Sequence, residues 1–412
     1  MHSFFGGRYC PQLQSSVDSG LKSGPSQMHG LVLCEKTTGK MGGDFCEAIR
    51  ARFIMRELPG TPSVDTRSRL ACQESAFCRR LHEGKCYISV GGSPSAMGQI
   101  KYMHPTEADI GPIVRAWNLS RRGLPLERDY TIGELRAEIF DDEDYDINGS
   151  WVAEAKGEVV GFGRGIVERK RVESGLSEGF VTVEVVPEHR GRGIEKEIMN
   201  RVLAHLRSRH LERAEYSCPT LTGWRNTLFE EYGFKDARHF FRMVRKGGNP
   251  PNDIRIPAGV RFERKMFIDA NEQDISLLVA TFNETFSEHF GFSPVSDKRW
   301  LRLRDAYEDI GMITFAIRDG RTVGMCFSDE SVLYNKEHGS KAGWVWIIGV
   351  TKSERGKGIG RALLADSITW LAGRGIDTVY LGLDAENRKA LVLYTSLGFE
   401  VILENIYYRL GL

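Results

Sequence analysis

Apolar residues in this chain recur with two periods, and from residue 99 onward they outline a regular succession of strands and helices. Alternation at every second position predicts a strand, and apolar residues three or four positions apart predict a helix with one buried face. In the first half these patterns predict a strand near Ile100, helices at 106–119, 132–139 and 194–209, and strands at 150–155, 158–167 and from Gly179. In the second half they predict strands at 260–264, 312–317, 322–328, 344–350 and 378–383, and helices at 272–286 and 297–307.

The two halves repeat each other. Arg355, Gly358 and Phe399 each lie 165 residues after Arg190, Gly193 and Phe234. Both halves also have a Gly-containing hairpin turn between two strands, Lys156-Gly157 and Asp319-Gly320. A constant offset of this kind indicates duplication. We therefore predict two tandem domains at 97–245 and 259–412, joined by a Gly- and Pro-rich linker at 246–258.

Residues 1–96 lack a sustained helix or strand period, although 45–58 has the pattern of a short helix. We expect this segment to be a poorly ordered extension. Met97 and Met103 lie close to the first regular element, so one interpretation is an over-extended reading frame. The alternative is a lineage-specific appendage.

Composition limits the function classes. A chain of 412 residues is long enough for two to three domains. With 56 basic and 55 acidic residues, it has no excess of positive charge that would indicate nucleic-acid binding. No apolar run is long enough to span a membrane, so we expect a soluble cytoplasmic protein. Six of the eight cysteines lie before residue 97, with no Cys-x-x-Cys pair, and we expect no metal site.

The candidate chemistry lies in residues 343–364, which we interpret as a buried strand, a glycine-rich turn and the start of a helix. Glycines let a ligand approach the backbone, and a helix N-terminus offers free N–H groups and a positive dipole end. Such a turn can hold a pyrophosphate. The alternative is a tight turn that binds nothing.

The residues that follow make the pattern specific. Arg-x-x-Gly-x-Gly begins at Arg355, and Asn387, Ala390, Tyr394 and a Leu-Gly-Phe sequence ending at Phe399 come after it. This combination resembles the GNAT superfamily of acyl-CoA-dependent N-acyltransferases. The resemblance implies an α/β (α+β) fold in each domain, a mixed, mostly antiparallel sheet flanked by helices. The tandem arrangement and residues 282–290 are similar to those of mycothiol synthases and related tandem members.

The resemblance also implies roles for individual residues. Acetyl-CoA is the expected acyl donor, and Tyr394 corresponds to the family's general acid, which protonates the departing thiolate. A tyrosine that only packs its helix on the sheet is the alternative for Tyr394, and N-capping is the alternative for Asn387. The expected cofactor-binding residues are Ile348, Gly349, Val350, Arg355, Gly356, Lys357, Gly358, Ile359, Gly360, Arg361 and Asn387.

The general base is not evident from the sequence. Many relatives have a Glu on the strand equivalent to 344–350, and this strand has none. Asp329, Glu330 and Glu308 are candidates, with a surface charge as the alternative for each.

The first half serves as an internal comparison. Glu195, Phe229 and Thr222 occupy the positions 165 residues before Gly360, Tyr394 and Asn387. A carboxylate repels a pyrophosphate, and phenylalanine has no proton to donate. We therefore expect catalysis in the second domain, with the first shaping the acceptor pocket or stabilising the pair.

Two functions of different classes remain. The favoured hypothesis is transfer of an acetyl or similar acyl group to a primary amine, carried by a small molecule or a peptide. The alternative is a non-catalytic acyl-CoA-binding or partner-binding module. The sequence leaves the acceptor and the oligomeric state open.

Overall fold

The computed structural model describes residues 33–34, 51–52, 99–220, 223–251 and 255–412. Strands β1 (Leu33–Cys34) and β2 (Ala51–Arg52) pair antiparallel in a unit of their own. The helix predicted at 45–58 is therefore wrong at Ala51 and Arg52, because their backbones pair with another strand and not along a helix. The remaining predictions for residues 1–96 lie outside the described residues.

Twelve strands of the described part from residue 99 onward form one mixed sheet, in the order β3-β4-β5-β6-β7-β14-β8-β13-β12-β11-β10-β9. The strands of the first copy are β3 (Lys101–Met103), β4 (Ser150–Ala155), β5 (Glu158–Ile166), β6 (Glu178–Val185), β7 (Arg213–Pro219) and β8 (Lys235–Lys246). Those of the second copy are β9 (Val260–Met266), β10 (Ile310–Arg318), β11 (Arg321–Glu330), β12 (Ala342–Val350), β13 (Thr378–Asp384) and β14 (Glu400–Gly411).

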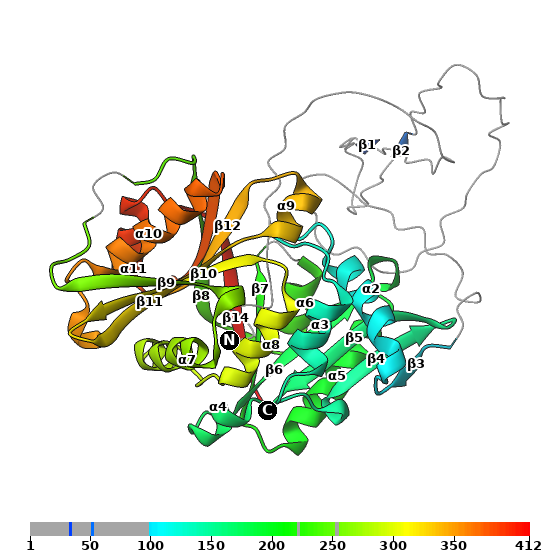
Figure 1. Cartoon of the computed structure of the whole chain (residues 1–412). Coiled ribbons are helices and arrows are strands. Elements are labelled where there is room, and N and C mark those ends of the chain that lie inside the picture. Colours follow the sequence, from blue (N-terminus) through cyan, green and yellow to red (C-terminus); the bar gives the residue numbers. More distant parts are fainter. Residues whose placement is uncertain (1–32, 35–50, 53–98, 221–222, 252–254) are drawn as a thin grey trace, which may run out of the picture. The chain divides into compact units, whose positions relative to one another are not determined.

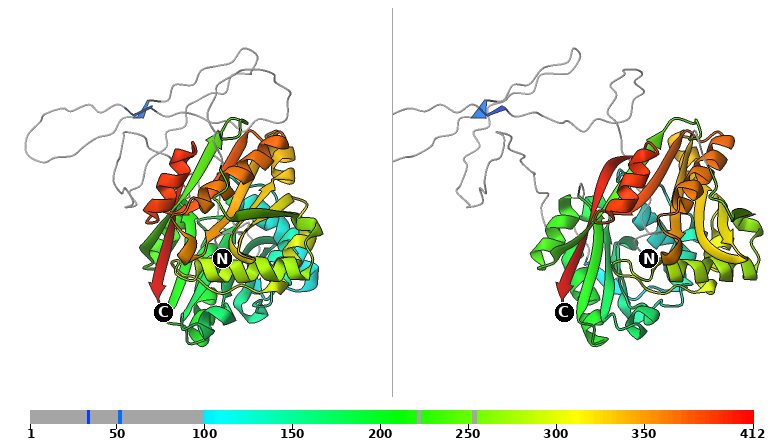
Figure 2. Two further views of the ribbon diagram at one scale, coloured as in Figure 1. Left: turned by 60° about the vertical axis from the view of Figure 1, so that its left-hand side comes forward. Right: turned by 90° about the vertical axis from the view of Figure 1, so that its left-hand side faces the viewer.

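The last strand of each copy is exchanged with the other copy. β8 of the first copy pairs with β13 of the second, and β14 at the C-terminus pairs with β7 of the first. β8 and β14 also pair with each other at the centre of the sheet. In Figures 1 and 2 the red β14 accordingly runs beside green strands of the first copy. The two copies therefore share one continuous sheet, and the predicted linker at 246–258 joins β8 to β9.

Helices cover both faces of this sheet. On one face lie α2 (Ile110–Arg121) and α3 (Ile132–Leu135) of the first copy and α7 (Glu272–Phe286) and α8 (Asp297–Ala306) of the second. On the other lie α5 (Ile194–Ser208), α6 (Gly223–Glu231), α10 (Ile359–Gly373) and α11 (Arg388–Ser396). The shorter helices are α4 (Arg169–Glu173) and α9 (Val332–His338). Each face buries its own apolar clusters, which is the mixed α/β architecture expected from the sequence.

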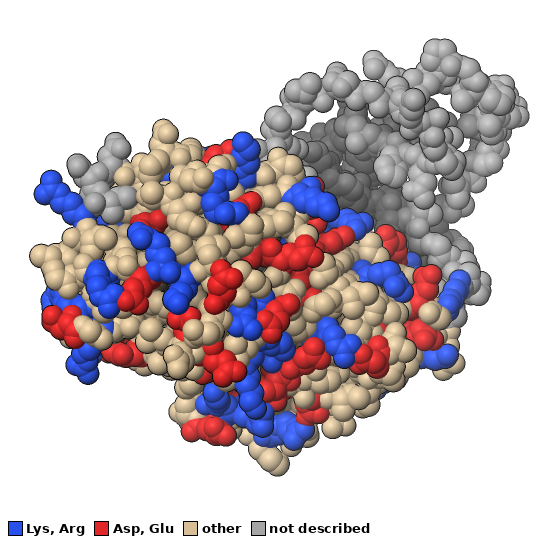
Figure 3. All heavy atoms as spheres, in the orientation of Figure 1, with Lys and Arg blue, Asp and Glu red and all other residues tan. Residues whose placement is uncertain are grey.

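Most predicted elements are confirmed to within a few residues. The helix at 272–286 and the strand at 150–155 have the predicted bounds, and both hairpin turns are present. Lys156, Gly157, Asp319 and Gly320 all have positive φ, as the turns require. Acidic and basic side chains are interspersed over the face drawn in Figure 3, in keeping with the balanced composition.

Candidate active site

A wedge opens between β12 and β13. These parallel strands pair from Ala342–Thr378 to Val345–Leu381 and no further. Beyond that point β12 continues to Val350 paired on its other edge with β11, and β13 continues to Asp384 paired with β8. Ile348, Gly349 and Val350 thus have one edge of their backbone facing the wedge. An extended chain that carries amides can hydrogen-bond to such an edge.

The glycine-rich turn lies at the wide end of the wedge. Gly356 and Gly358 have φ of +79° and +83°, a left-handed conformation that favours glycine with or without a ligand. Gly358 is the N-cap of α10, and the bond from Ala362 N to Gly358 O, 3.0 Å, starts the helix. Gly360 is the second residue of α10 and does not have a positive φ, and an added Cβ there would meet only ordinary contacts at 3.7 Å or more. The N–H groups at the start of α10 form an anion-binding geometry.

Several of the predicted cofactor residues use their side chains to hold the turn in place. Arg355 donates from Nε to Val350 O and from Nη2 to Thr285 O, both at 3.0 Å, and pairs with Glu288. Lys357 pairs with Glu354 at 3.0 Å, and Arg361 donates to Ser396 Oγ at 2.7 Å. Ile359 is buried in the core. A contact from this turn to a ligand therefore falls mainly to the backbone.

Tyr394 and Asn387 lie at α11. The side-chain oxygen of Asn387 accepts a hydrogen bond from Ala390 N at 3.1 Å, so Asn387 does cap the helix. Tyr394 is 6% exposed, and its hydroxyl has no hydrogen-bond partner among the described residues. Burial raises the pKa of Tyr394 well above its ordinary value. The phenol therefore keeps its proton over the whole physiological range.

A β-bulge interrupts β12 where the wedge begins. Phe327 of β11 pairs with Ile347 and Ser328 pairs with Val345, so Trp346 is the extra residue. A bulge leaves backbone groups outside the regular ladder and re-aims them. In the first copy, β5 and β6 pair from Gly161–Val185 to Ile166–Phe180 without such a shift. The sequence analysis did not predict this feature.

The three candidate bases lie in different surroundings. Asp329 is buried and accepts a hydrogen bond from Trp346 Nε1 at 2.6 Å. Glu330 pairs with Arg374 at 2.7 Å, and Glu308 is exposed. Of the three, Asp329 is therefore the one in contact with the bulge.

His289 is a further titratable group near the wedge. It follows α7, packs on Phe286 with 4.6 Å between ring centroids, and interacts electrostatically with Arg355 and Asp384. Arg355 follows β12 and Asp384 ends β13, so the imidazole lies near the ends of both diverging strands. Burial, and then the charge of Arg355, lower the pKa of His289 below its ordinary value. His289 belongs to the segment 282–290 singled out in the sequence, but its chemistry was not predicted.

The equivalent turn of the first copy contains its own anion. Gly191 N donates to Glu195 Oε1 at 2.9 Å, so the carboxylate of Glu195 takes up an N–H of the glycine-rich turn. Arg190 repeats the contacts of Arg355, donating to Val185 O and Ser120 O at 2.9 and 2.7 Å. The arginine contacts that hold the turn are thus retained, while the carboxylate of Glu195 occupies the position where an anion would bind.

The wedge of the first copy is also filled. β6 and β7 pair only from Glu178–Arg213 to Phe180–Glu215. Beyond that point Glu184 of β6 is buried and forms an ion pair with Arg225 of α6 and another with Arg121 at 2.8 Å. Ser120 Oγ donates to the same carboxylate at 2.6 Å. Burial opposes the charge of Glu184, but Arg225 and Arg121 outweigh it and lower the pKa of this carboxyl.

Small residues occupy the matching positions of the second copy. Gly349 and Ala390 stand 165 residues after Glu184 and Arg225, so no ion pair can form across the wedge there. An added Cβ at Gly349 would collide with Thr285 of α7. Phe229, at the position of Tyr394, stacks on Tyr216 at 3.6 Å, and Thr222 lies outside the described residues. The sequence analysis missed the Glu184–Arg225 pair, although the same offset could have revealed it.

The family model for the acetyltransferase (GNAT) family matches this chain twice, at residues 117–234 and 276–399. The matched regions cover more than half of the chain and include both wedges. The chain therefore belongs to the GNAT acetyltransferase family, as its sequence motifs indicated.

Its relatives include mycothiol acetyltransferases. It is 25% identical to a mycothiol acetyltransferase of Propionibacterium freudenreichii over 44% of this chain and 56% of that protein. It is 27% identical to one of Saccharomonospora viridis over 55% of this chain and 72% of that protein. The match thus spans little more than half the length of the first of these relatives.

Solved structures show the same fold. A tandem GNAT protein from the clavulanic acid biosynthesis pathway has a TM-score of 0.59 at 14% identity, covering 76% of this chain and 98% of that one. A GCN5-related N-acetyltransferase from Sphaerobacter thermophilus has a TM-score of 0.54 at 23% identity, covering 76% and 95%. The described residues contain no helix long and apolar enough to cross a membrane, and no cluster of three or more potential metal ligands.

Proposed function

We propose that the second copy transfers an acetyl or similar acyl group from acyl-CoA to a primary amine. One observation supports this assignment above the others. The second copy has Gly349, Gly360, Ala390 and Tyr394 at the positions where the first copy has Glu184, Glu195, Arg225 and Phe229. The residues that fill one wedge are absent from the other.

The backbone of the second copy would hold the donor. The N–H groups of residues 356–361 would bind the pyrophosphate at the start of α10, where the helix dipole favours negative charge. Ile348, Gly349 and Val350 would hydrogen-bond to the amides of the pantetheine arm along the open edge of β12. The side-chain oxygen of Asn387 already caps α11, so its NH₂ group remains to donate a hydrogen bond to acyl-CoA.

Two groups of the chain would act on the thioester. The bulge at Trp346 frees backbone N–H groups that can polarise a carbonyl oxygen at the narrow end of the wedge. Tyr394 would donate its proton to the departing thiolate. Cys326 lies near Tyr394, but burial raises the pKa of its thiol to about 12, so it is a poor nucleophile and direct transfer to the amine is favoured.

His289 is our candidate for the base that deprotonates the incoming amine. Its lowered pKa keeps the imidazole neutral, and therefore basic, at neutral pH. Asp329 stays a candidate as well, but Trp346 already donates to its carboxylate.

His289→Gln is expected to lower kcat about 100-fold, the usual contribution of a general base. In the native protein, kcat/KM for the amine should fall as the pH drops through the pKa of His289, because protonation removes the base. That fall should occur at a lower pH than for an ordinary histidine, and in the variant it should disappear. Rates measured between pH 5 and 9 with saturating acetyl-CoA test this, and a variant with an unchanged profile would assign the base elsewhere.

The first copy would position the segment between α7 and α8 of the second copy, beside which the acceptor would bind. Arg171 donates to Gly291 O, and Lys170 Nζ donates to Val295 O at 3.3 Å, so α4 holds the segment between α7 and α8 at two points. Asp142 pairs with Arg302 and Arg299 of α8 at 2.6 and 3.2 Å. The segment between α7 and α8 contains His289. By holding this segment in place, the first copy can contribute to the activity of the second without binding acyl-CoA itself.

A small-molecule amine is the acceptor class that the relatives favour, since they are named for mycothiol, and a peptide amine is the alternative.

Binding of the acyl donor is tested by titrating acetyl-CoA into the protein in a calorimeter. We expect one site per chain. Two sites would contradict closure of the first copy, and none would contradict the function.

A further inference from the structure

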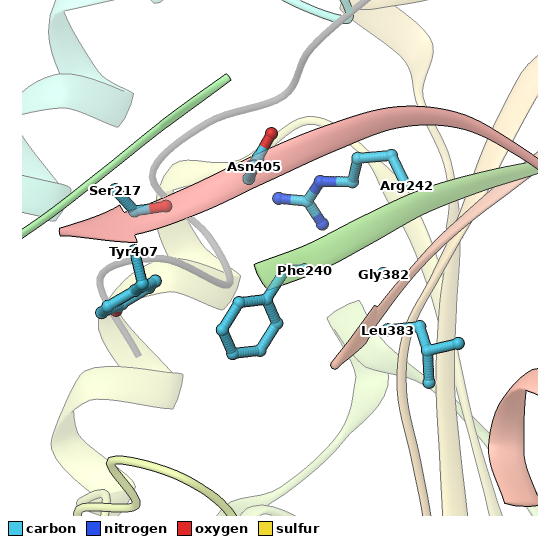
Figure 4. A pocket seen from close by; sticks show the side chains of 7 residues that line it. All are labelled: Ser217, Phe240, Arg242, Gly382, Leu383, Asn405 and Tyr407. Carbon is cyan, nitrogen blue, oxygen red and sulfur yellow. The ribbon is translucent and has the colours of Figure 1, made fainter. Parts of the chain in front are cut away.

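A narrow hollow lies on the sheet face that carries α7, at the junction of the two copies. Its lining residues come from four adjacent strands, β7, β14, β8 and β13, and are Ser217, Phe240, Arg242, Gly382, Leu383, Asn405 and Tyr407. In Figure 4 the guanidinium of Arg242 reaches from β8 toward Phe240 and Asn405. The hollow is small, with room for one or two water-sized groups such as the oxygens of a carboxylate and too little for a whole substrate.

The hollow adjoins the wedge of the second copy. Pairing between β12 and β13 ends at Leu381, and Gly382 is the next residue along β13. The guanidinium of Arg242 lies over the ring of Trp344, which precedes the bulge on β12. A molecule that reached the bulge from this face would therefore have its other end near Arg242.

The polar groups of the hollow are suited to an anion. Arg242 is the charged residue of the lining and is 6% exposed. Its fork has five N–H donors, so it can keep a protein partner and still bind a ligand. Asn405 is 5% exposed, and its Oδ1 has no hydrogen-bond partner among the described residues. The amide can turn about its last torsion to donate, and the Ser217 hydroxyl adds a third donor.

Gly382 keeps this arrangement possible. A Cβ at this position would lie 2.6 Å from Arg242 Nη1, too close for the guanidinium to stay where it is. The chain therefore has a glycine opposite a buried arginine inside a strand, where glycine is otherwise unfavourable.

We propose that this hollow binds a carboxylate of the acceptor, so that the substrates are primary amines that also carry a carboxylate. The inference rests on the proposed function and specifies its acceptor class. A planar carboxylate matches the guanidinium fork, and the amide and hydroxyl donors flank it. Phe240, Leu383 and Tyr407 would contact the apolar part of the molecule next to the carboxylate.

The test uses a panel of amines, each supplied as the free acid and as its primary amide: α-amino acids, β-alanine, γ-aminobutyrate and dipeptides. For the best pair, kcat/KM should be at least about tenfold higher for the acid. In Arg242→Gln the KM for that acid should rise about 10- to 100-fold, as for loss of a charge-assisted pair, and the preference should fall to about one. The KM for acetyl-CoA should change less than about twofold.

Matched variants separate binding from folding. Arg374→Gln, which removes a surface pair with Glu330, should keep the preference for acids. Asn405→Leu should weaken it without removing the buried cation, and it provides the test if Arg242→Gln does not fold. The proposal is overturned if the native protein prefers the amides or shows no preference, or if the preference survives Arg242→Gln with a normal KM for acetyl-CoA.

The failure of this proposal can be told apart from failure of the proposed function. If acetyl-CoA does not bind, the function itself is wrong. If acetyl-CoA binds but no amine is turned over, the same acids are titrated in a calorimeter into the protein saturated with CoA. Absence of binding there overturns the carboxylate site.

Discussion

Tyr394→Phe is expected to lower kcat about 100- to 1,000-fold while the KM for acetyl-CoA changes little. The phenol is buried, it has no hydrogen-bond partner among the described residues, and its raised pKa keeps it protonated. Removing the hydroxyl removes the proposed proton donor without leaving a protein group unpaired. Steady-state rates with saturating acetyl-CoA and thermal unfolding of both proteins measure the two effects.

The first copy offers the matched control. Phe229→Tyr places a phenol at the equivalent position, where Phe229 stacks on Tyr216. We expect it to add no activity and to leave the rate of the second copy unchanged. Should Tyr394→Phe turn over at the native rate, the general-acid role would be wrong and Tyr394 would only pack α11 on the sheet.

Gly360→Glu is expected to weaken binding of acetyl-CoA at least about 100-fold. The substitution reproduces the first copy, where Glu195 accepts a hydrogen bond from the N–H of Gly191. A carboxylate at this point would take up the N–H of Gly356 and repel the pyrophosphate. The fold should tolerate it, because a Cβ fits at Gly360 and an acidic residue suits the first turn of a helix.

Glu195→Gly is the control for this substitution. It empties the anion position of the first copy but leaves the Glu184–Arg225 pair across the wedge. Calorimetric titration should therefore still find one acetyl-CoA per chain. Native-like affinity in Gly360→Glu would show that the pyrophosphate lies away from α10.

The sequence predicted the parts of the fold whose pattern is local. Helix α7 has an apolar face at helical spacing and a capping box at Asn271, and both hairpin turns have the Gly that the turn geometry needs. The central strands were not predicted. β8 contains five Lys or Arg residues in its 12 positions, a composition that hides its strand character. Their charges are met by distant partners, as when Arg238 pairs with Asp384.

The candidate site was likewise predicted only where its residues form a local pattern in the sequence. Tyr394, Gly360 and Asn387 belong to a motif contiguous enough to read along the chain. The Glu184–Arg225 pair, the bulge at Trp346 and the position of His289 depend on contacts between segments far apart in sequence. The exchange of β8 and β14 also builds the hollow around Arg242 from both copies, which no pattern within one copy could indicate.

The central claim is that this chain is an enzyme, and amine-dependent release of CoA thiol tests it most directly. Purified protein is incubated with acetyl-CoA and each amine of the panel, and free thiol and N-acetylated product are quantified together. We predict equal amounts of thiol and product with at least one amine, and loss of both in Tyr394→Phe. Tight binding of acetyl-CoA without amine-dependent thiol release would contradict the account and favour a non-catalytic acyl-CoA-binding module.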